Sequence, residues 1–544
     1  MRKFLLTTAS VAALLASSPA LAAGPNNTST VDQSGTAQAV IFHQDGVNDT
    51  SSVVQKGKNS TTTIKQNGIV GGSSSVDQNG DGNTADVTQS DDGSANAGGT
   101  LIINPSVTIP LQGKPISISS IVQLGDGNGA DVVQKTATDA IVNTSAIGQV
   151  GSGGKAHVKQ YDDGQTSSIT QSSTGNTATV TQGVDNNLDN SYYNNSYVNQ
   201  SGANNTGTVT QSGAANVSSV TQSGSSSHAT VSQTANLGSS GVSQSGNNDT
   251  AFVTQSTNRQ VSGVDQHAAN NYAIVSQSSL AADTSSVSQF GANDAARVTQ
   301  KGAGGNSSSI YQNATTSSYA GETGTELGAA VLNDANYSSY DEVRQNGSGL
   351  TSAINQTGKG DFAFVQQLND NNHSTVVQSG EGNWAYVDQA GHDNTAGYSQ
   401  SGSQTTVSAG NVIAEARGIH QSGDHNQAYV SQTGSGTDFY NGSYLNSRNS
   451  INVVQSNSLN FASVNQGGVD NRLDLLQSGA SNTTYATQAG TNETATLNQL
   501  GNGNLISLYQ GGLNSTAVIT QYSDNNVASI TQTGTGSIVG TQGH

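Results

Sequence analysis

Glutamine recurs at intervals of eleven residues through most of this sequence. The clearest examples are Gln200, Gln211, Gln222, Gln233, Gln244, Gln255, Gln266 and Gln277, with Gln378 and Gln389 in a later series. A carboxamide donates and accepts hydrogen bonds at the same time, so identical amides stacked above one another can bond in a continuous chain. This spacing therefore predicts recognition between copies of one short unit, and not the transformation of a substrate.

Three further residue types keep a fixed position relative to the glutamines. They are a branched apolar residue two positions before (Val209, Val220, Val231, Val253, Val387), glycine two positions after (Gly202, Gly213, Gly224, Gly246, Gly380, Gly391) and asparagine five positions after (Asn216, Asn271, Asn383, Asn394). The unit reads Q-x-G-x-x-N-x-A-x-V-x-Q. From Asn to Gln the marked positions are every second residue, which is the side-chain period of one face of a β-strand. The glycine segment predicts a tight turn, with glycine available for a positive φ.

One such strand buries too little to be stable alone, but stacked copies can share an interior. Alanine in one unit partly alternates with serine in the next, which indicates a true repeat of about 22 residues. We therefore predict an all-β fold: a β-solenoid of strand-turn-strand rungs, each made of two eleven-residue units, with two facing parallel sheets. In this fold the Gln and Asn columns point inward, and each side-chain amide donates to the copy above and accepts from the copy below. The ends remain open sheet edges.

Composition narrows the classes of protein that this sequence can encode. Only 32% of residues are hydrophobic and 10% are charged, so the chain is either disordered or forms cross-β stacks rich in neutral amides. The net charge of −19 argues against a nucleic-acid partner. Residues 1–22, with Arg2, Lys3, an apolar run and Ala20-Leu21-Ala22, are predicted to be a secretory signal peptide. No later stretch is apolar enough to predict a membrane span.

Residues with catalytic or metal-binding chemistry do not cluster in the sequence. The nine histidines fall in different phases of the repeat, and there is no cysteine. "GDGN" at 80–83 and 125–128 lacks the spacing of known calcium loops and is explained by turn chemistry. We therefore predict no catalytic residue, no cofactor, no metal site and no enzyme activity.

The repeat is interrupted at several places. We expect units of this repeat at 23–89, 121–312 and 343–544, a proline-containing insertion or degenerate rungs at 90–120, and degenerate repeats or a loop at 313–342. Shorter interruptions fall near 403–418 and 433–452.

The unit resembles the curlin repeat of bacterial curli fibres, Ser-x5-Gln-x-Gly-x-x-Asn-x-Ala-x3-Gln. "QSGEGNWAYVDQ" matches it at Gln378, Gly380, Asn383, Ala385 and Gln389, and "QLGNGNLISLYQ" matches in part. The resemblance implies a secreted, extracellular subunit of a curli-like functional amyloid on the surface of a Gram-negative bacterium, involved in biofilm, cell adhesion and aggregation. It also implies self-association into fibres (a fimbrium-like or pilus-like role), export through a curli-type outer-membrane secretion pore and growth from a nucleator subunit. The chain is much longer than a typical curlin.

Two other functions fit the same predicted fold. The first is a monomeric secreted β-solenoid that acts as an adhesin or surface spacer. The second is an ice-binding solenoid, suggested by outward hydroxyls in Thr179-Val-Thr181 and Thr208-Val-Thr210, although Phe252 and Arg297 interrupt the threonine array elsewhere.

Overall fold

A computed structural model describes residues 26–67, 71–91, 100–102, 108–110, 117–136, 142–183, 192–313, 339–358, 360–381, 383–405, 418–433, 436–437 and 449–543. These residues form strands and turns, and no helix occurs among them. The chain divides into two compact units, Met1–Ser262 and Gly263–His544, with β21 (Val261–Gln266) at the boundary. The predicted signal segment 1–22 lies outside the described residues.

The first unit contains two parallel sheets, whose strands alternate along the chain. Sheet A consists of β1 (Thr28–Thr36), β3 (Thr50–Lys58), β5 (Ser73–Asn79), β9 (Ser117–Leu124), β11 (Asn143–Val150), β13 (Thr166–Ser172), β15 (Asn195–Gln200), β17 (Val217–Gln222) and β19 (Ser239–Gln244). Sheet B consists of β2 (Ala39–Gln44), β4 (Thr61–Asn67), β6 (Thr84–Asp91), β10 (Gly129–Thr136), β12 (Lys155–Tyr161), β14 (Thr177–Gln182), β16 (Thr206–Gln211), β18 (His228–Gln233) and β20 (Thr250–Gln255).

The second unit repeats this arrangement. Its sheet A consists of β23 (Thr284–Gln289), β25 (Ser307–Gln312), β27 (Thr351–Gln356), β29 (His373–Glu381), β31 (Thr395–Thr405), β33 (Gln427–Thr433), β36 (Phe461–Gln466), β38 (Thr483–Gln488), β40 (Leu505–Gln510) and β42 (Val527–Gln532), and β34 (Gly436–Thr437) pairs with β31. Its sheet B consists of β22 (Tyr272–Gln277), β24 (Asp294–Gly304), β26 (Ser339–Ser348), β28 (Asp361–Asp370), β30 (Trp384–Gln389), β32 (Ile419–Gln421), β35 (Ser450–Gln455), β37 (Arg472–Gln477), β39 (Thr494–Gln499), β41 (Ser515–Gln521) and β43 (Gly536–Gln542).

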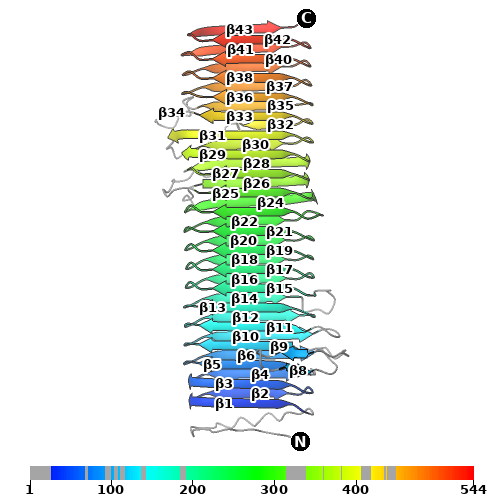
Figure 1. The fold of residues 1–544 in the computed structure, drawn as a ribbon, viewed down its shortest axis with the longest axis vertical. Helices are drawn as coiled ribbons and strands as arrows, with labels where there is room; N and C mark the ends of the chain where they lie inside the picture. Colours follow the sequence, from blue (N-terminus) through cyan, green and yellow to red (C-terminus); the bar gives the residue numbers. More distant parts are fainter. Residues whose placement is uncertain are drawn as a thin grey trace. The chain divides into compact units, whose positions relative to one another are not determined.

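Strand register follows the sequence repeat in both units. In the first unit, Val220 of β17 pairs with Val198 and Val242, and Gln222 pairs with Gln200 and Gln244. A strand therefore pairs with the copy of itself one rung away, and in the regular stretches that rung is 22 residues long. Figure 1 shows these rungs stacked within each unit, with short turns between successive strands. The predicted fold, an all-β solenoid of 22-residue rungs with two parallel sheets, is confirmed.

Burial alternates along each strand because successive side chains point to opposite faces of the sheet. In β16 the pattern is intermediate, buried, intermediate, buried, intermediate, buried, which places Val209 and Gln211 on the interior face. The interior of each unit is narrow: it is filled by Val, Ile and Leu at one position, Ala or Ser at a second, and Gln at a third. This is how a chain with few apolar residues obtains a continuous core.

The predicted interruptions insert between rungs without changing the register on either side. β7 (Thr100–Ile102) and β8 (Thr108–Pro110) form an antiparallel pair within the predicted segment 90–120, and β9 already begins at Ser117. In the second unit β26 begins at Ser339, inside the predicted segment 313–342. Much of the segments 90–120, 313–342, 403–418 and 433–452 lies outside the described residues.

Candidate functional site: the interior amide columns

The glutamines form hydrogen-bonded ladders inside both units. All ten glutamines singled out from the sequence are at most 1% exposed. In the first unit Gln200 Nε2 donates to Gln222 Oε1 at 2.8 Å, and Gln222 Nε2 donates to Gln244 Oε1 at 2.8 Å. The neighbouring ladder joins Gln211, Gln233 and Gln255 in the same way. In the second unit the bonds from Gln266 to Gln289, Gln277 to Gln300, Gln378 to Gln400 and Gln389 to Gln421 measure 2.7–2.8 Å.

Each glutamine also bonds to the opposite sheet. Gln222 Nε2 donates to the carbonyl oxygen of Thr206, and Gln211 Nε2 donates to that of Asn195, 16 residues earlier in each case. One amide group therefore links its own rung to the next rung and to the facing strand. Because the amide is satisfied on both sides, its burial avoids the penalty of about 1–3 kcal/mol for an unpaired polar group.

The ladders continue across the first insertion, and in sheet B across the second; in sheet A, Gln356 pairs with Gln312 in register but its Oε1 has no donor among the described residues. Gln78 Nε2 donates to Gln123 Oε1 at 2.7 Å, and Gln300 Nε2 donates to Gln345 Oε1 at 2.9 Å, each across 45 residues of sequence. The two glutamines of each pair occupy consecutive rungs, because the strands that carry them are paired in register. The hydrogen-bond distance between successive glutamines therefore stays nearly constant, although their separation in sequence changes.

The asparagine column is buried but differs from the expected side-chain ladder. Asn216 Oδ1 accepts from the backbone N–H of Gly238, and Asn394 Oδ1 accepts from that of Asn426, at 2.8–2.9 Å. Asn271 Oδ1 accepts from the N–H of Asp294 in the same way. The asparagine side chain is one methylene shorter than glutamine, so its oxygen reaches the backbone of the next rung and not the next side chain. The position needs an acceptor, and Asp361 fills it for the N–H of Asn383.

The predicted turn glycines are required for close contact between rungs more than for a positive φ. A Cβ at Gly213 would lie 2.1 Å from the carbonyl oxygen of Ala235, and one at Gly224 would lie 1.5 Å from that of Gly246. The positive φ falls two residues later, for example at Ala215 (56°) and Ser226 (59°). Gly202 and Gly391 meet carbonyl oxygens in the same way as Gly224, whereas Gly380 does have a positive φ of 119°. The stacked turns therefore leave no room for a side chain at Gly202, Gly213, Gly224 and Gly391.

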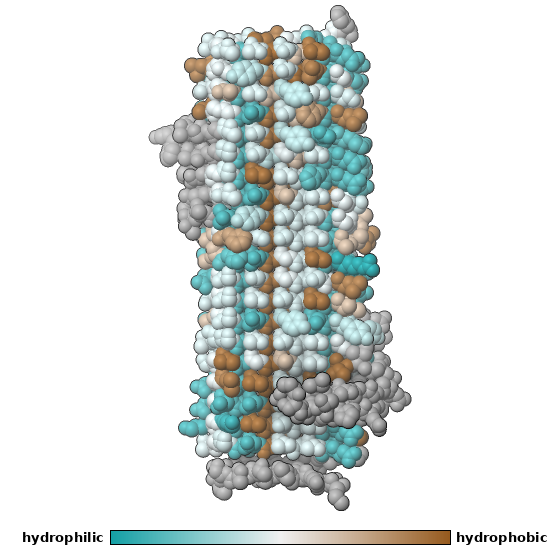
Figure 2. Space-filling model, viewed as in Figure 1, coloured by the Kyte–Doolittle hydropathy of each residue, from teal (hydrophilic) through white to brown (hydrophobic). Residues whose placement is uncertain are grey.

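The apolar column lies beside the glutamine ladder. Val209, Val220, Val231, Val253 and Val387 are at most 1% exposed. Next to them sheet B of the first unit carries Ala229 and Ala251, while sheet A carries Ser218 and Ser240, whose hydroxyl oxygens have no hydrogen-bond partner among the described residues. Figure 2 shows apolar residues following a narrow line from rung to rung, flanked by polar residues on either side.

The end strands are more exposed than the interior rungs. In β1 the inward residues Val31 and Gln33 are only half-buried, and Gln33 Nε2 donates to Gln55 Oε1 at 2.6 Å. In β43 the inward residues Ile538 and Gln542 are likewise half-buried, and Val539 is 74% exposed. The ladders run in one direction, since each glutamine donates towards the C-terminal rung. The N-terminal strand therefore presents the amide oxygen of Gln33, for which no described residue is a donor. The C-terminal strand presents the second amide N–H of Gln542, since Gln542 Nε2 also donates to the carbonyl oxygen of Val527 at 3.1 Å.

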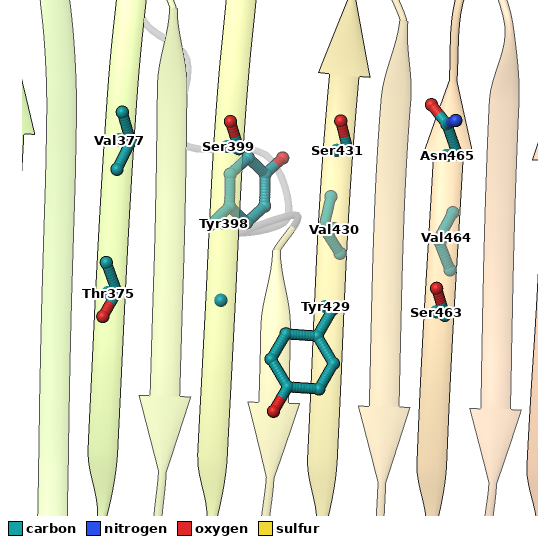
Figure 3. Close-up of a pocket in the computed structure, with 11 residues that line it drawn as sticks. Thr375, Val377, Tyr398, Ser399, Tyr429, Val430, Ser431, Ser463, Val464 and Asn465 are labelled. Carbon is teal, nitrogen blue, oxygen red and sulfur yellow. The ribbon is translucent and has the colours of Figure 1, made fainter.

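A shallow groove of about 390 Å³ crosses the outer face of sheet A in the second unit (Figure 3). It passes over β29, β31, β33 and β36, where Gly397 leaves a gap and the Tyr429 ring would be 2.9 Å from a Cβ placed there. Its lining is neutral and includes no histidine, acid or base, so it has no nucleophile and base in contact. Within the described residues, no group of three or more His, Cys, Asp or Glu is placed to hold a metal ion. The same residues contain no helix long and apolar enough to cross a membrane.

Sequence reasoning missed the carboxylates of the interior. Asp294 and Asp361 occupy asparagine positions, and Asp341 occupies an alanine position between Ala296 and Ala363. All three are at most 1% exposed. Counting six residues back from Gln300 and Gln367, and four back from Gln345, would have placed them in the interior.

Comparison with known proteins agrees with this repeat geometry. The sequence pattern of the curlin associated repeat matches residues 202–234, 370–402 and 468–501. Each matched stretch spans about three eleven-residue units of the solenoid. No curated protein matches the whole chain at a significant level. The matched repeats lie in both units and share the buried Gln and Asn columns, so the chain contains curlin associated repeats in each unit.

Proposed function

We propose that the mature chain is a structural subunit of curli-like extracellular amyloid fibres, which grow by addition of subunits at the open ends of the solenoid. The observation that carries this proposal is the pair of exposed end strands, β1 and β43. Unpaired strand edges are templates for another chain, and soluble proteins normally protect them with charge, proline or a covering element. The inward faces of these strands carry Val31, Ile538 and Gln542, which are residues of the repeat and not of a cap.

The direction of the glutamine ladders gives this growth a polarity. An incoming chain that continues both sheets places its β1 on β42 and its β2 on β43. It then brings the amide oxygen of its Gln33 to the amide of Gln532, and that of its Gln44 to the amide of Gln542. The same donor-to-acceptor bond would then continue across the junction that joins Gln521 to Gln542 inside the chain at 2.8 Å. This contact is heterologous and does not close, so it leads to a filament.

The remaining features of the proposal rest on the likeness of these repeats to the curlin repeat. They are secretion after removal of residues 1–22, export through a curli-type outer-membrane pore, growth from a nucleator subunit and a place in the biofilm matrix at the cell surface. The net charge of −19 is expected to slow association at low salt, because subunits of like charge repel until they are screened.

Purified mature chain tests the proposal. We expect it to form fibres with a lag, to increase thioflavin fluorescence and to diffract at about 4.8 Å along the fibre axis. Fragments of these fibres should abolish the lag. A chain that stays monomeric for days at micromolar concentration, with or without fragments, would instead fit an adhesin or spacer and would refute the fibre proposal.

Two lysine variants of β43 test whether its inward face is the growing surface. Ile538 pairs with the interior residue Ala517, whereas Ser537 pairs with Thr516 and is exposed. An inward lysine on an edge strand blocks strand addition. We expect Ile538→Lys to reduce the elongation rate at least tenfold and Ser537→Lys to leave it within about twofold. Equal rates for the two variants would exclude β43 as the growing edge.

A further inference from the structure

Three aspartates are enclosed within one short stretch of the second unit. Asp294 lies on β24, Asp341 on β26 and Asp361 on β28, and the exposed fraction of each is 0–1%. In the strand register Ser339 separates Asp294 from Asp361, and Asp341 lies two residues further along the middle strand. The cluster therefore occupies three consecutive rungs of the interior, which elsewhere in this unit contains mainly neutral side chains.

The two arginines on the described strands β24 and β26 point away from Asp341. Arg297 and Arg344 alternate with interior residues along β24 and β26, so they point to the outer face of the sheet. There Arg344 Nε pairs with Glu342 Oε1 at 2.6 Å, and Tyr340 donates to Glu342 Oε2 at 2.9 Å. These contacts lie on the outer face of the sheet, away from the interior cluster.

The strands that face Asp341 bring only neutral groups. On β25 the nearest is Gln312, whose Nε2 donates to the carbonyl oxygen of Ala295 at 2.9 Å. β27 carries no titratable residue. No hydrogen bond of ordinary geometry from a described residue reaches either carboxyl oxygen of Asp341. Asp361 differs, since its Oδ1 accepts from the backbone N–H of Asn383 at 2.9 Å.

These surroundings favour the protonated form of Asp341. Burial is the largest cause and raises the pKa of Asp341 well above its ordinary value, and the charges of Asp294 and Asp361 raise it further. Gln312 and the backbone of Ala363 lower the pKa by a smaller amount. An ionised carboxyl group in this position would be a buried charge with two like charges close by, which is costly enough to open the structure around it.

We propose that Asp341, flanked by Asp294 and Asp361, is a proton-operated switch that closes the rungs β24, β26 and β28 in acid and loosens them as the pH rises. An acid whose pKa is raised in the folded state stabilises that state fully below its unfolded pKa of about 4. The stabilisation is then lost as the pH rises towards the folded pKa. In this range the equilibrium constant for opening increases about tenfold per pH unit for each proton released. The switch is a property of the folded chain and does not depend on fibre formation.

Hydrogen exchange of the monomeric mature chain, followed by mass spectrometry between pH 5 and pH 8, tests the proposal. After correction for intrinsic exchange rates, we expect peptides from β24, β26 and β28 to lose protection by about tenfold per pH unit over at least part of this range. Peptides from β36 should keep constant protection, because its rung carries Asn460 in the asparagine column and the neighbouring rungs carry Asn426 and Asn482, not acids.

Substitution at position 341 provides the decisive comparison. Asp341→Ala places alanine between Ala296 and Ala363, and should remove the pH dependence and raise protection of β26 at pH 7 at least tenfold. Asp341→Asn, which keeps the shape without the charge, should also remove the pH dependence. Asp388→Asn, on the outer face of β30, makes the same charge change and should leave the pH dependence intact. An unchanged slope in both Asp341 variants, or lower protection than the natural chain at pH 7 in both, would overturn the proposal.

Discussion

Removal of one interior amide should weaken the solenoid far more than removal of its exposed neighbour. The Gln222 amide donates to Gln244 Oε1, to the carbonyl oxygen of Thr206 and to that of Ser227, and it accepts from Gln200 Nε2, all at 2.8–3.1 Å. In Gln222→Ala, Gln244 loses its donor and Gln200 loses an acceptor. Each buried group left unpaired costs about 1–3 kcal/mol, and the vacated space adds a cavity term. We therefore expect a loss of about 3–5 kcal/mol in local stability.

This loss is measured by hydrogen exchange of amides in β15, β17 and β19. A change of about 3–5 kcal/mol corresponds to an increase of roughly 10²–10⁴-fold in the opening constant. Ser223→Ala is the matched control, because Ser223 is exposed and its backbone N–H still donates to the carbonyl oxygen of Gln244. We expect this control to exchange within about threefold of the natural chain. The same difference should appear in fibre assembly, which Gln222→Ala should slow.

Gln222→Leu separates the ladder from simple filling of space. Leucine occupies a similar volume but cannot bond to Gln200 or Gln244. If hydrogen bonding along the ladder stabilises the rungs, Gln222→Leu should remain at least about 2 kcal/mol less stable than the natural chain. A leucine variant as stable as the natural chain, or equal effects of Gln222→Ala and Ser223→Ala, would refute the reasoning.

Three further predictions follow from the interior of the first unit. Gly224→Ala should destabilise the turn by at least about 2 kcal/mol, because a Cβ would lie 1.5 Å from the carbonyl oxygen of Gly246. Thermal melts measure this loss, and Ser223→Ala, one residue earlier, is again the control. Ser218→Ala should leave stability unchanged or raise it by about 1 kcal/mol, since the buried hydroxyl has no partner among the described residues. Clear destabilisation of this variant in denaturant titrations would contradict the prediction. Burial raises the pKa of Asp49 to about 7, so its rung should lose as much as about 4 kcal/mol as the pH rises from 4 to 7. Asp49→Asn should abolish that dependence in hydrogen exchange, and a persistent slope would show that another group titrates.

The fold could be predicted because two periods coincide in the sequence. The alternation that places Val220 and Gln222 on one face gives the strand, and the recurrence of both every eleven residues gives the stack. A glutamine exposed to solvent would not need to keep a fixed spacing from an interior valine in every unit. The pairing of the units into 22-residue rungs followed from the alternation of alanine with serine, which the structure assigns to sheets B and A of the first unit.

The roles of the other columns could not be predicted from spacing. Whether Asn216 bonds to the next side chain or to the next backbone depends on the reach of one methylene group at the distance between rungs. Whether Gly224 is needed for its φ or for its missing side chain depends on how closely two turns approach. Neither quantity is encoded in a pattern of residue types.

The acidic cluster was hidden by an irregular spacing. Gln312 and Gln345 are 33 residues apart, and the inserted segment obscured the register in which Asp341 takes the place of an alanine. A carboxylate in a sequence of this composition also looks like an ordinary surface charge, because nine in ten residues are uncharged and most acids serve solubility. Its burial emerges only when β26 is aligned with β24 and β28.

The most direct test of the account is a map from electron cryomicroscopy, of the chain or its fibre, at a resolution that shows side-chain amides. We predict that the Gln200, Gln222 and Gln244 amides lie between the two sheets, with nitrogen and oxygen of successive rungs about 2.8 Å apart. A map in which these amides face solvent, or in which successive rungs place them out of register, would contradict the central claim.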